Sequence, residues 1–101
     1  MVSKKRKIVW DNSAKAYLKQ SLQYIKNDSP QNADTIRNDI RALVKEIPSH
    51  PSRYPADKFR INNNGSYRAL TIYNFRISYF IGENEIRIVR IRHTKQSPLE
   101  Y

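Results

Sequence analysis

Two consecutive apolar stripes with helical spacing constrain this chain most. The first stripe repeats at i, i+4, i+8 and i+11, in Ala14, Leu18, Leu22 and Ile25. The second repeats every 3.6 residues, in Ala33, Ile36, Ile40, Leu43, Val44 and Ile47. Residues 27–30 separate the stripes, with Ser29 as a helix N-cap and Pro30 at the first helical position. This short link predicts an antiparallel pair of helices, and Pro48 ends the second one.

The residues on either side of the stripes predict β-strands. A β-branched and aromatic run at 7–10 precedes the first helix. A proline-containing connector follows the second helix, and then come four runs separated by Asn and Gly turns, at 58–61, 67–73, 75–81 and 85–92. In the last run the apolar phase switches between Ile88 and Val89, which indicates either a β-bulge or burial of both faces.

The order β-α-α-β-β-β-β predicts an α+β fold. We expect one antiparallel sheet with the N-terminal helix hairpin packed on one face, which leaves the other face for polar side chains. A length of 101 residues allows one domain with one modest core, so a single domain is expected over residues 1–101.

The charge balance indicates an anionic partner. The chain has 19 Lys and Arg against 9 Asp and Glu, a net charge of +10. This excess attracts polyanions, so nucleic acid is the first partner class and an acidic protein is the second. Six arginines fall on the four C-terminal runs: Arg60, Arg68, Arg76, Arg87, Arg90 and Arg92. An arginine-rich sheet of this kind is suited to holding an anion.

Other function classes are excluded by what the sequence lacks. It has no cysteine, two histidines and two glycines. Disulfides, thiol catalysis, Cys-rich or His-rich metal sites and glycine-rich phosphate loops are therefore not expected, nor is a metal or cofactor. No apolar run reaches the length of a membrane span, and no signal-peptide core follows the basic start, so we expect no membrane association and a cytoplasmic location.

An ordered set of short segments resembles the RelE/ParE toxins. These segments are residues 8–18, 24–25 and 29–33, Leu43 ahead of Pro48, and residues 67–68, 75–79 and 88–93. The resemblance implies the toxin of a bacterial type II toxin–antitoxin system, neutralised by a cognate antitoxin in a hetero-oligomer. RelE-like members cut mRNA in the ribosomal A site. ParE-like members poison DNA gyrase and lack the RNase residues.

The resemblance also implies roles for single residues. RelE-like cleavage uses Arg, Lys, His and Tyr side chains without a metal. Arg68 matches the family's Tyr-Arg position and would clamp a phosphate; its alternative is a strand-end salt bridge, perhaps to Glu85. His93 would be a general acid or base, or instead a hydrogen-bonded turn histidine. Lys95 supplies a basic tail residue.

The remaining candidates lie on the tail and the strands. Tyr101 would stack on a base or shuttle a proton, or instead anchor the tail against the sheet. Five further cations are candidate nucleic-acid contacts: Lys58, Arg60, Arg76, Arg90 and Arg92. Arg76 has the alternative of capping the core rim through its aliphatic stem. No carboxylate in the strand region is placed to act as a general base, so the base must be Lys or His, or the function is not RNA cleavage.

Three functions therefore stay open for this sequence. The first choice is a toxin that arrests growth by ribosome-dependent mRNA cleavage, which would make it a metal-independent endoribonuclease. The alternatives are a DNA gyrase inhibitor without intrinsic catalysis and an inactive homologue that retains only antitoxin binding. All three share one fold, so the fold alone does not separate them.

Overall fold

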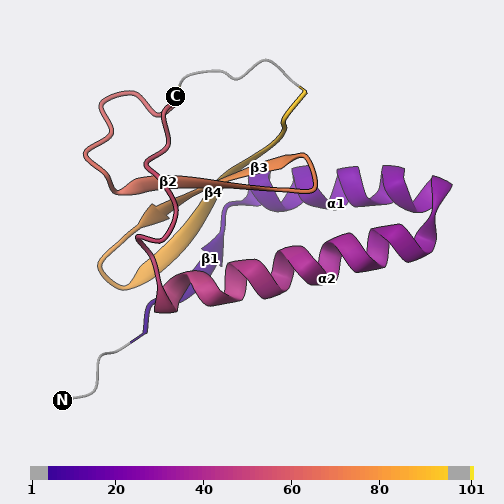
Figure 1. Ribbon diagram of the computed structural model, residues 1–101, viewed down its shortest axis with the longest axis horizontal. Helices are drawn as coiled ribbons and strands as arrows, with labels where there is room; N and C mark the ends of the chain where they lie inside the picture. The colour runs from indigo at the N-terminus through magenta and orange to yellow at the C-terminus, as the bar shows by residue number, and fades with distance from the viewer. Residues whose placement is uncertain (1–4, 96–100) are drawn as a thin grey trace.

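The computed structural model describes residues 5–95 and 101, and it has two helices and a four-stranded sheet (Figure 1). The elements in chain order are β1 (Lys7–Trp10), α1 (Asn12–Asp28), α2 (Pro30–Glu46), a short 3-10 turn (Ile47–Ser49), β2 (Tyr67–Ile72), β3 (Phe75–Ile81) and β4 (Glu85–His93). The two helices run antiparallel and pack on one face of the sheet. The predicted α+β fold and its helix hairpin are confirmed.

The helix boundaries follow the local signals in the sequence. Ser29 caps α2 by accepting a hydrogen bond from the Asn32 backbone N–H at 3.3 Å, and Pro30 opens the helix. Asp11 occupies the N-cap position of α1, but its side chain makes no capping hydrogen bond. Its carboxylate instead pairs with Arg87 of β4 at 2.7 Å, which ties the start of α1 to the sheet.

The sheet is mixed and not wholly antiparallel, which corrects the expected topology. Its strand order is β1-β4-β3-β2; β2, β3 and β4 form an antiparallel meander, while β1 runs parallel to β4. Lys7 lies opposite Glu85 in this parallel pair. The Asp11 backbone N–H donates to the Ile88 carbonyl at 2.9 Å, so the chain stays hydrogen-bonded to β4 until α1 begins. Such a long-range pairing leaves no local signal in the sequence.

The predicted strand at 58–61 is wrong, because this segment turns. The Asp57 side chain accepts a hydrogen bond from the Phe59 backbone N–H at 3.1 Å. The Asp57 backbone carbonyl accepts one from the Arg60 backbone N–H at 3.3 Å. Aspartate often closes turns in this way, in competition with strand pairing. Asn62 then adopts a left-handed conformation with φ of 55°, which a strand does not contain.

The end of β2 also differs by one residue from the expectation. Tyr73 and Asn74 have positive φ values of 51° and 64° and form the two-residue turn into β3. A turn of this kind matches the right-handed twist of a hairpin. β2 therefore ends at Ile72.

The irregularity in β4 is a β-bulge, one of the two alternatives that the sequence left open. Ser78 pairs with Arg90 and Tyr79 pairs with Ile88, so Val89 is the extra residue. The bulge lets β4 bury isoleucines both before and after it on the helix side of the sheet: Ile86, Ile88 and Ile91. The alternating arginines of β4 consequently keep to the opposite, open face.

The core lies between the helix hairpin and the sheet. Its largest fully buried side chains are Ile40, Ile47, Ile77, Tyr79, Ile86 and Ile88. Burying one such isoleucine contributes about 1.5–3 kcal/mol. The Tyr79 hydroxyl donates to the Pro51 carbonyl at 2.7 Å, and burial raises the Tyr79 pKa to about 12. Within residues 5–95, neither helix has the length and apolar character needed to cross a membrane.

Candidate functional site

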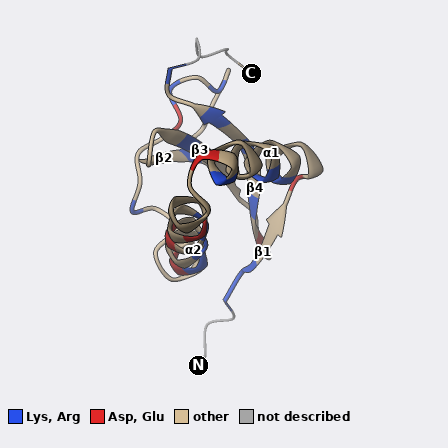
Figure 2. Ribbon diagram, turned by 90° about the vertical axis from the view of Figure 1, so that its right-hand side faces the viewer, with Lys and Arg blue, Asp and Glu red and all other residues tan. Residues whose placement is uncertain are grey.

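The open face of the sheet concentrates positive charge. Cross-strand pairing places Arg76 of β3 directly opposite Arg92 of β4, and Ser78 opposite Arg90. Like charges directly opposite each other destabilise a sheet, so this arrangement suits an anion better than it suits the isolated fold. Figure 2 shows basic residues along β4 and also on the helices, so the net charge of +10 is spread around the molecule.

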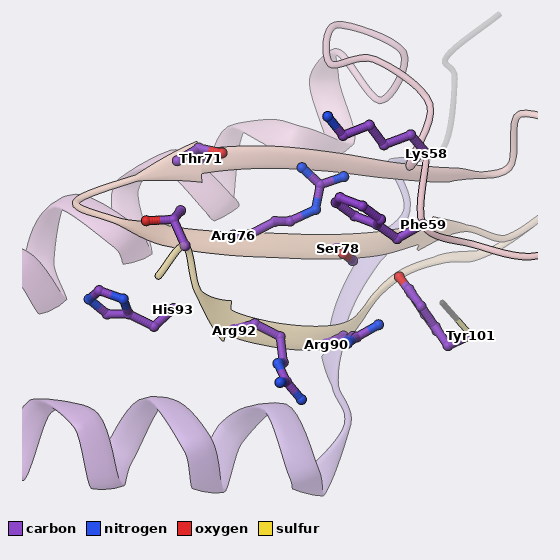
Figure 3. Close-up of a pocket in the computed structure, with 10 residues that line it drawn as sticks. Lys58, Phe59, Thr71, Arg76, Ser78, Arg90, Arg92, His93 and Tyr101 are labelled. Carbon is purple, nitrogen blue, oxygen red and sulfur yellow. The ribbon is translucent and has the colours of Figure 1, made fainter. Parts of the chain in front are cut away.

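A hollow of about 180 Å³ lies on this face (Figure 3). Six of the nine site residues predicted from the sequence line it: Lys58, Arg76, Arg90, Arg92, His93 and Tyr101. These residues come from β3, from β4, from the loop after Asp57 and from the end of the sequence. We call this hollow the arginine pocket.

The pocket is organised by Asp57, a residue that the sequence analysis missed. Its side chain is 1% exposed and accepts hydrogen bonds from Arg76 Nη2 at 2.8 Å, from the Phe59 backbone N–H and from the Tyr101 hydroxyl. Burial alone would raise the Asp57 pKa, but these bonds, together with one involving Ser78, hold the pKa below its ordinary value. Asp57 is therefore an ionised counter-charge for Arg76. The only sequence signal was the preference of aspartate for turns.

Tyr101 is anchored to the loop that follows Asp57. Its backbone N–H donates to the Phe59 carbonyl at 3.0 Å, and its carbonyl accepts from the Ile61 N–H at 2.5 Å. Burial raises the pKa of its phenol to about 12, and the hydrogen bond to Asp57 acts in the same direction. Tyr101 is therefore anchored, as in the alternative that the sequence offered, but its backbone is held by this loop and not by a strand of the sheet.

Two of the predicted nucleic-acid contacts lie against tyrosine rings. The Arg60 guanidinium carbon lies 4.1 Å from the centre of the Tyr67 ring and 5.0 Å from that of Tyr101. Arg60 Nη2 also donates to the Tyr67 hydroxyl at 3.1 Å. Arg90 lies 4.5 Å from the centre of the Tyr101 ring. These cation–π contacts fix both guanidinium groups at the edge of the arginine pocket.

Arg92 differs from its neighbours in having a buried donor without an acceptor. Among the described residues, no hydrogen-bond partner faces its Nε atom. A buried donor left unsatisfied costs about 1–3 kcal/mol. Lys58 is exposed at the pocket, with its Nζ atom 5.2 Å from the centre of the Phe59 ring. Lys58 is therefore available to a bound anion, and Arg92 has a donor that no described residue satisfies.

His93 and Lys95 lie at the end of β4. The Lys95 backbone N–H donates to His93 Nδ1 at 3.1 Å, which is the bond expected of a hydrogen-bonded turn histidine. The His93 ring meets Phe75 edge-on with ring centres 5.9 Å apart, and its backbone N–H donates to the Tyr17 hydroxyl. His93 lines the pocket, whereas Lys95 lies outside the pocket lining and is exposed.

Arg68 lies apart from the arginine pocket. It pairs with Tyr79, a core residue, and donates from Nε to the Gly65 carbonyl at 2.8 Å and from Nη1 to the Tyr54 carbonyl at 3.0 Å. The suggested bridge to Glu85 is absent from the described contacts, because Glu85 pairs with Arg87 at 2.8 Å. The structure thus brings together His93 and Tyr101 of the predicted catalytic set and leaves Arg68 and Lys95 outside.

Comparison with protein families decides the identity of this fold. The family described as "ParE toxin of type II toxin-antitoxin system, parDE" matches residues 8–98. The chain belongs to the ParE toxin family. As a ParE toxin it is the toxin component of a type II toxin–antitoxin module, and its partner is a cognate antitoxin.

Solved structures share the fold of this ParE toxin. A structure of the "Chromosomal ParDE TA system from P. aeruginosa" matches with a TM-score of 0.72 and 22% identity, over 92% of this chain and 100% of the other. "The structure of YoeB dimer from Staphylococcus aureus" matches with a TM-score of 0.56 and 18% identity, over 88% of this chain and 97% of the other. Comparison with curated proteins gives no match. At these identities, the structural likeness carries the fold alone.

Proposed function

We propose that this ParE toxin arrests growth by binding and inhibiting DNA gyrase, without chemistry of its own. The observation that carries the proposal is the separation of the predicted catalytic residues. Arg68 is bound to backbone carbonyls away from the pocket, and the Tyr101 phenol is bound to Asp57. The match to the ParE family favours the same conclusion. Gyrase acts in the bacterial cytoplasm, and we place the toxin there.

The proton chemistry of the pocket supports a binding role. Cleavage of RNA through its own 2′-hydroxyl needs a base, a clamp for the charged phosphorane and an acid, all within reach of one phosphate. Asp57 is buried and accepts from several donors, so it serves Arg76 and is poorly placed to take a substrate proton. Tyr101, with a pKa of about 12, lies far from the neutral range that favours proton transfer.

Ribosome-dependent mRNA cleavage, the first choice of the sequence analysis, is the second candidate. The observation in its favour is that Arg76, Arg92 and His93 line one pocket. In that mechanism the two guanidinium groups would stabilise the phosphorane, and His93 would transfer the proton. The YoeB-like fold is compatible with either function.

One induction experiment separates the candidates. After expression of the toxin alone, gyrase inhibition should give SOS induction with intact mRNA, and purified toxin should block plasmid supercoiling by gyrase. Co-expression of the antitoxin from the neighbouring reading frame is the control and should restore growth. Codon-positioned cuts in primer extension, without an SOS response, would refute the gyrase proposal in favour of mRNA cleavage. Normal growth after induction of the intact protein would support the inactive homologue.

A further inference from the structure

The arginine pocket holds more positive charge than its described protein neighbours neutralise. Lys58, Arg76, Arg90 and Arg92 line it, and Asp57 is the carboxylate bound beside it. Asp57 pairs with Arg76 at 2.8 Å, whereas no described carboxylate forms an ion pair with Lys58 or Arg92. Lys58 and Arg92 therefore contribute positive charge that no described side-chain carboxylate pairs with. The pocket therefore favours an anionic ligand.

The geometry of the donors favours phosphate. Arg92 and Arg76 lie directly opposite each other across β3 and β4, and the buried Nε of Arg92 has no acceptor among the described residues. Planar guanidinium groups match the oxygens of a phosphate with paired N–H donors. The volume of about 180 Å³ is below the range of about 300–1,000 Å³ typical of sites for whole small molecules. A single phosphate group fits this size better than a nucleotide.

The surrounding charge favours a polymer of phosphates over a protein carboxylate. One Asp or Glu side chain would neutralise only one of the two cations, Lys58 and Arg92, that have no carboxylate partner among the described residues. Arg60 extends the basic surface beside the pocket, where it lies against the Tyr67 and Tyr101 rings. A nucleic-acid backbone presents successive negative charges and can meet both the pocket and its basic edge at once.

We propose that the arginine pocket binds a backbone phosphate of DNA, so that the toxin contacts the DNA held by gyrase as well as the enzyme. This inference rests on the proposed gyrase function for the choice of DNA. Arg92, which lines the pocket, donates to the phosphate from its guanidinium group. Arg76, positioned by Asp57, supplies the second guanidinium, and Lys58 adds a charge from the exposed loop.

The test is the salt dependence of binding to a labelled DNA duplex, measured by fluorescence anisotropy with purified toxin. If Arg92 neutralises one phosphate, Arg92→Gln should weaken binding and reduce the slope of log K against log salt concentration by about 1. Arg41→Gln is the matched control, because Arg41 is exposed on α2 and lies outside the pocket. Its slope should change less. Inorganic phosphate should compete with DNA for binding to the wild-type protein. It should not compete with DNA for binding to Arg92→Gln.

The possible outcomes distinguish a failure of the phosphate-binding proposal from a failure of the gyrase proposal. Equal slope changes in Arg92→Gln and Arg41→Gln, or no DNA binding by the wild type at low salt, would overturn the pocket proposal even if gyrase is still inhibited. Binding of poly-glutamate in place of DNA would overturn it as well. DNA binding that depends on Arg92, in a toxin that leaves gyrase active, would uphold the pocket and reject the gyrase function. If Arg92→Gln does not fold, the exposed Lys58→Gln should show the same reduction in slope.

Discussion

Replacing Asp57 by asparagine should destabilise the fold by about 2–4 kcal/mol. The Asp57 carboxylate is fully buried and receives hydrogen bonds from Arg76, from the Phe59 backbone N–H and from the Tyr101 hydroxyl. Asparagine keeps the shape and one oxygen acceptor, but it removes the charge and turns an amide group toward existing donors. The loop after Asp57 should therefore lose its attachment to the sheet.

The magnitude follows from the burial of the ion pair. Removing one partner of a fully buried ion pair costs about 3–5 kcal/mol, because the other charge stays desolvated. The Arg76 side chain is 24% exposed, so water compensates it in part and the expected loss falls to about 2–4 kcal/mol. For a domain of this size, each kcal/mol lowers the thermal midpoint by roughly 4–8 °C. The Asp57→Asn variant should therefore melt at least about 8 °C below the wild type.

Urea denaturation, followed by circular dichroism and by the fluorescence of Trp10, measures this loss. Asp34→Asn is the control, because the Asp34–Arg37 pair on α2 is largely exposed, with 63% and 48% of the side chains accessible. Exposed pairs of this kind contribute about 0.2–1 kcal/mol. If Asp57→Asn lost no more stability than Asp34→Asn, Asp57 could not be the organiser of the pocket.

The pH dependence gives a second check on Asp57. Its pKa in the folded protein is below the ordinary value of 3.8, so the folded state favours the carboxylate. The stabilisation from its ionisation is complete above pH 3.8 and is lost as the pH falls through the lowered pKa. The wild type and Asp57→Asn should therefore approach each other in stability in acid. A difference that stays constant down to the acid transition would contradict this assignment.

Two further variants test the remaining site residues. Tyr101→Phe removes the hydroxyl that donates to Asp57 and should cost about 1–2 kcal/mol in urea denaturation. The Tyr101 pKa is raised from 10.0 to about 12, so the extra stability of the wild type over Tyr101→Phe is complete below pH 10 and decreases as the pH rises toward 12. A stability difference between the two proteins that does not change with pH would contradict this. Arg68→Ala should cost about 1–3 kcal/mol, because the Gly65 and Tyr54 carbonyls lose their donor. The slope of log K for DNA binding against log salt concentration should be the same for Arg68→Ala as for the wild type. If a stably folded Arg68→Ala variant no longer arrested growth, Arg68 would have to be part of the functional site.

The features that the sequence predicts correctly are those with local causes. The two helices follow from apolar stripes that continue over several turns, and the start of α2 follows from Ser29 and Pro30. The break in apolar alternation next to Val89 indicates a bulge as one of two alternatives, and β4 has a bulge there. Each of these signals lies within a few residues of the feature that it specifies.

The features that the sequence does not predict depend on distant partners. Side chains alternate along a strand, so the face that Arg68 occupies depends on its register with Tyr79 of β3. The burial of Asp57 depends on Arg76 and Tyr101, which lie 19 and 44 residues away in the chain. The same holds for β1, whose parallel partner is the last strand.

The pairing of β1 with β4 has a consequence for the newly synthesised toxin. Lys7 meets Glu85 only after the ribosome has made nearly the whole domain. At about 5–20 residues per second, the roughly 80 intervening residues take about 4–16 s to synthesise. During that time the apolar stripe of α1 lacks β4, one of the surfaces that it covers in the finished fold. Translation therefore delays the first active toxin molecule, and a nascent chain halted before β4 cannot complete the sheet.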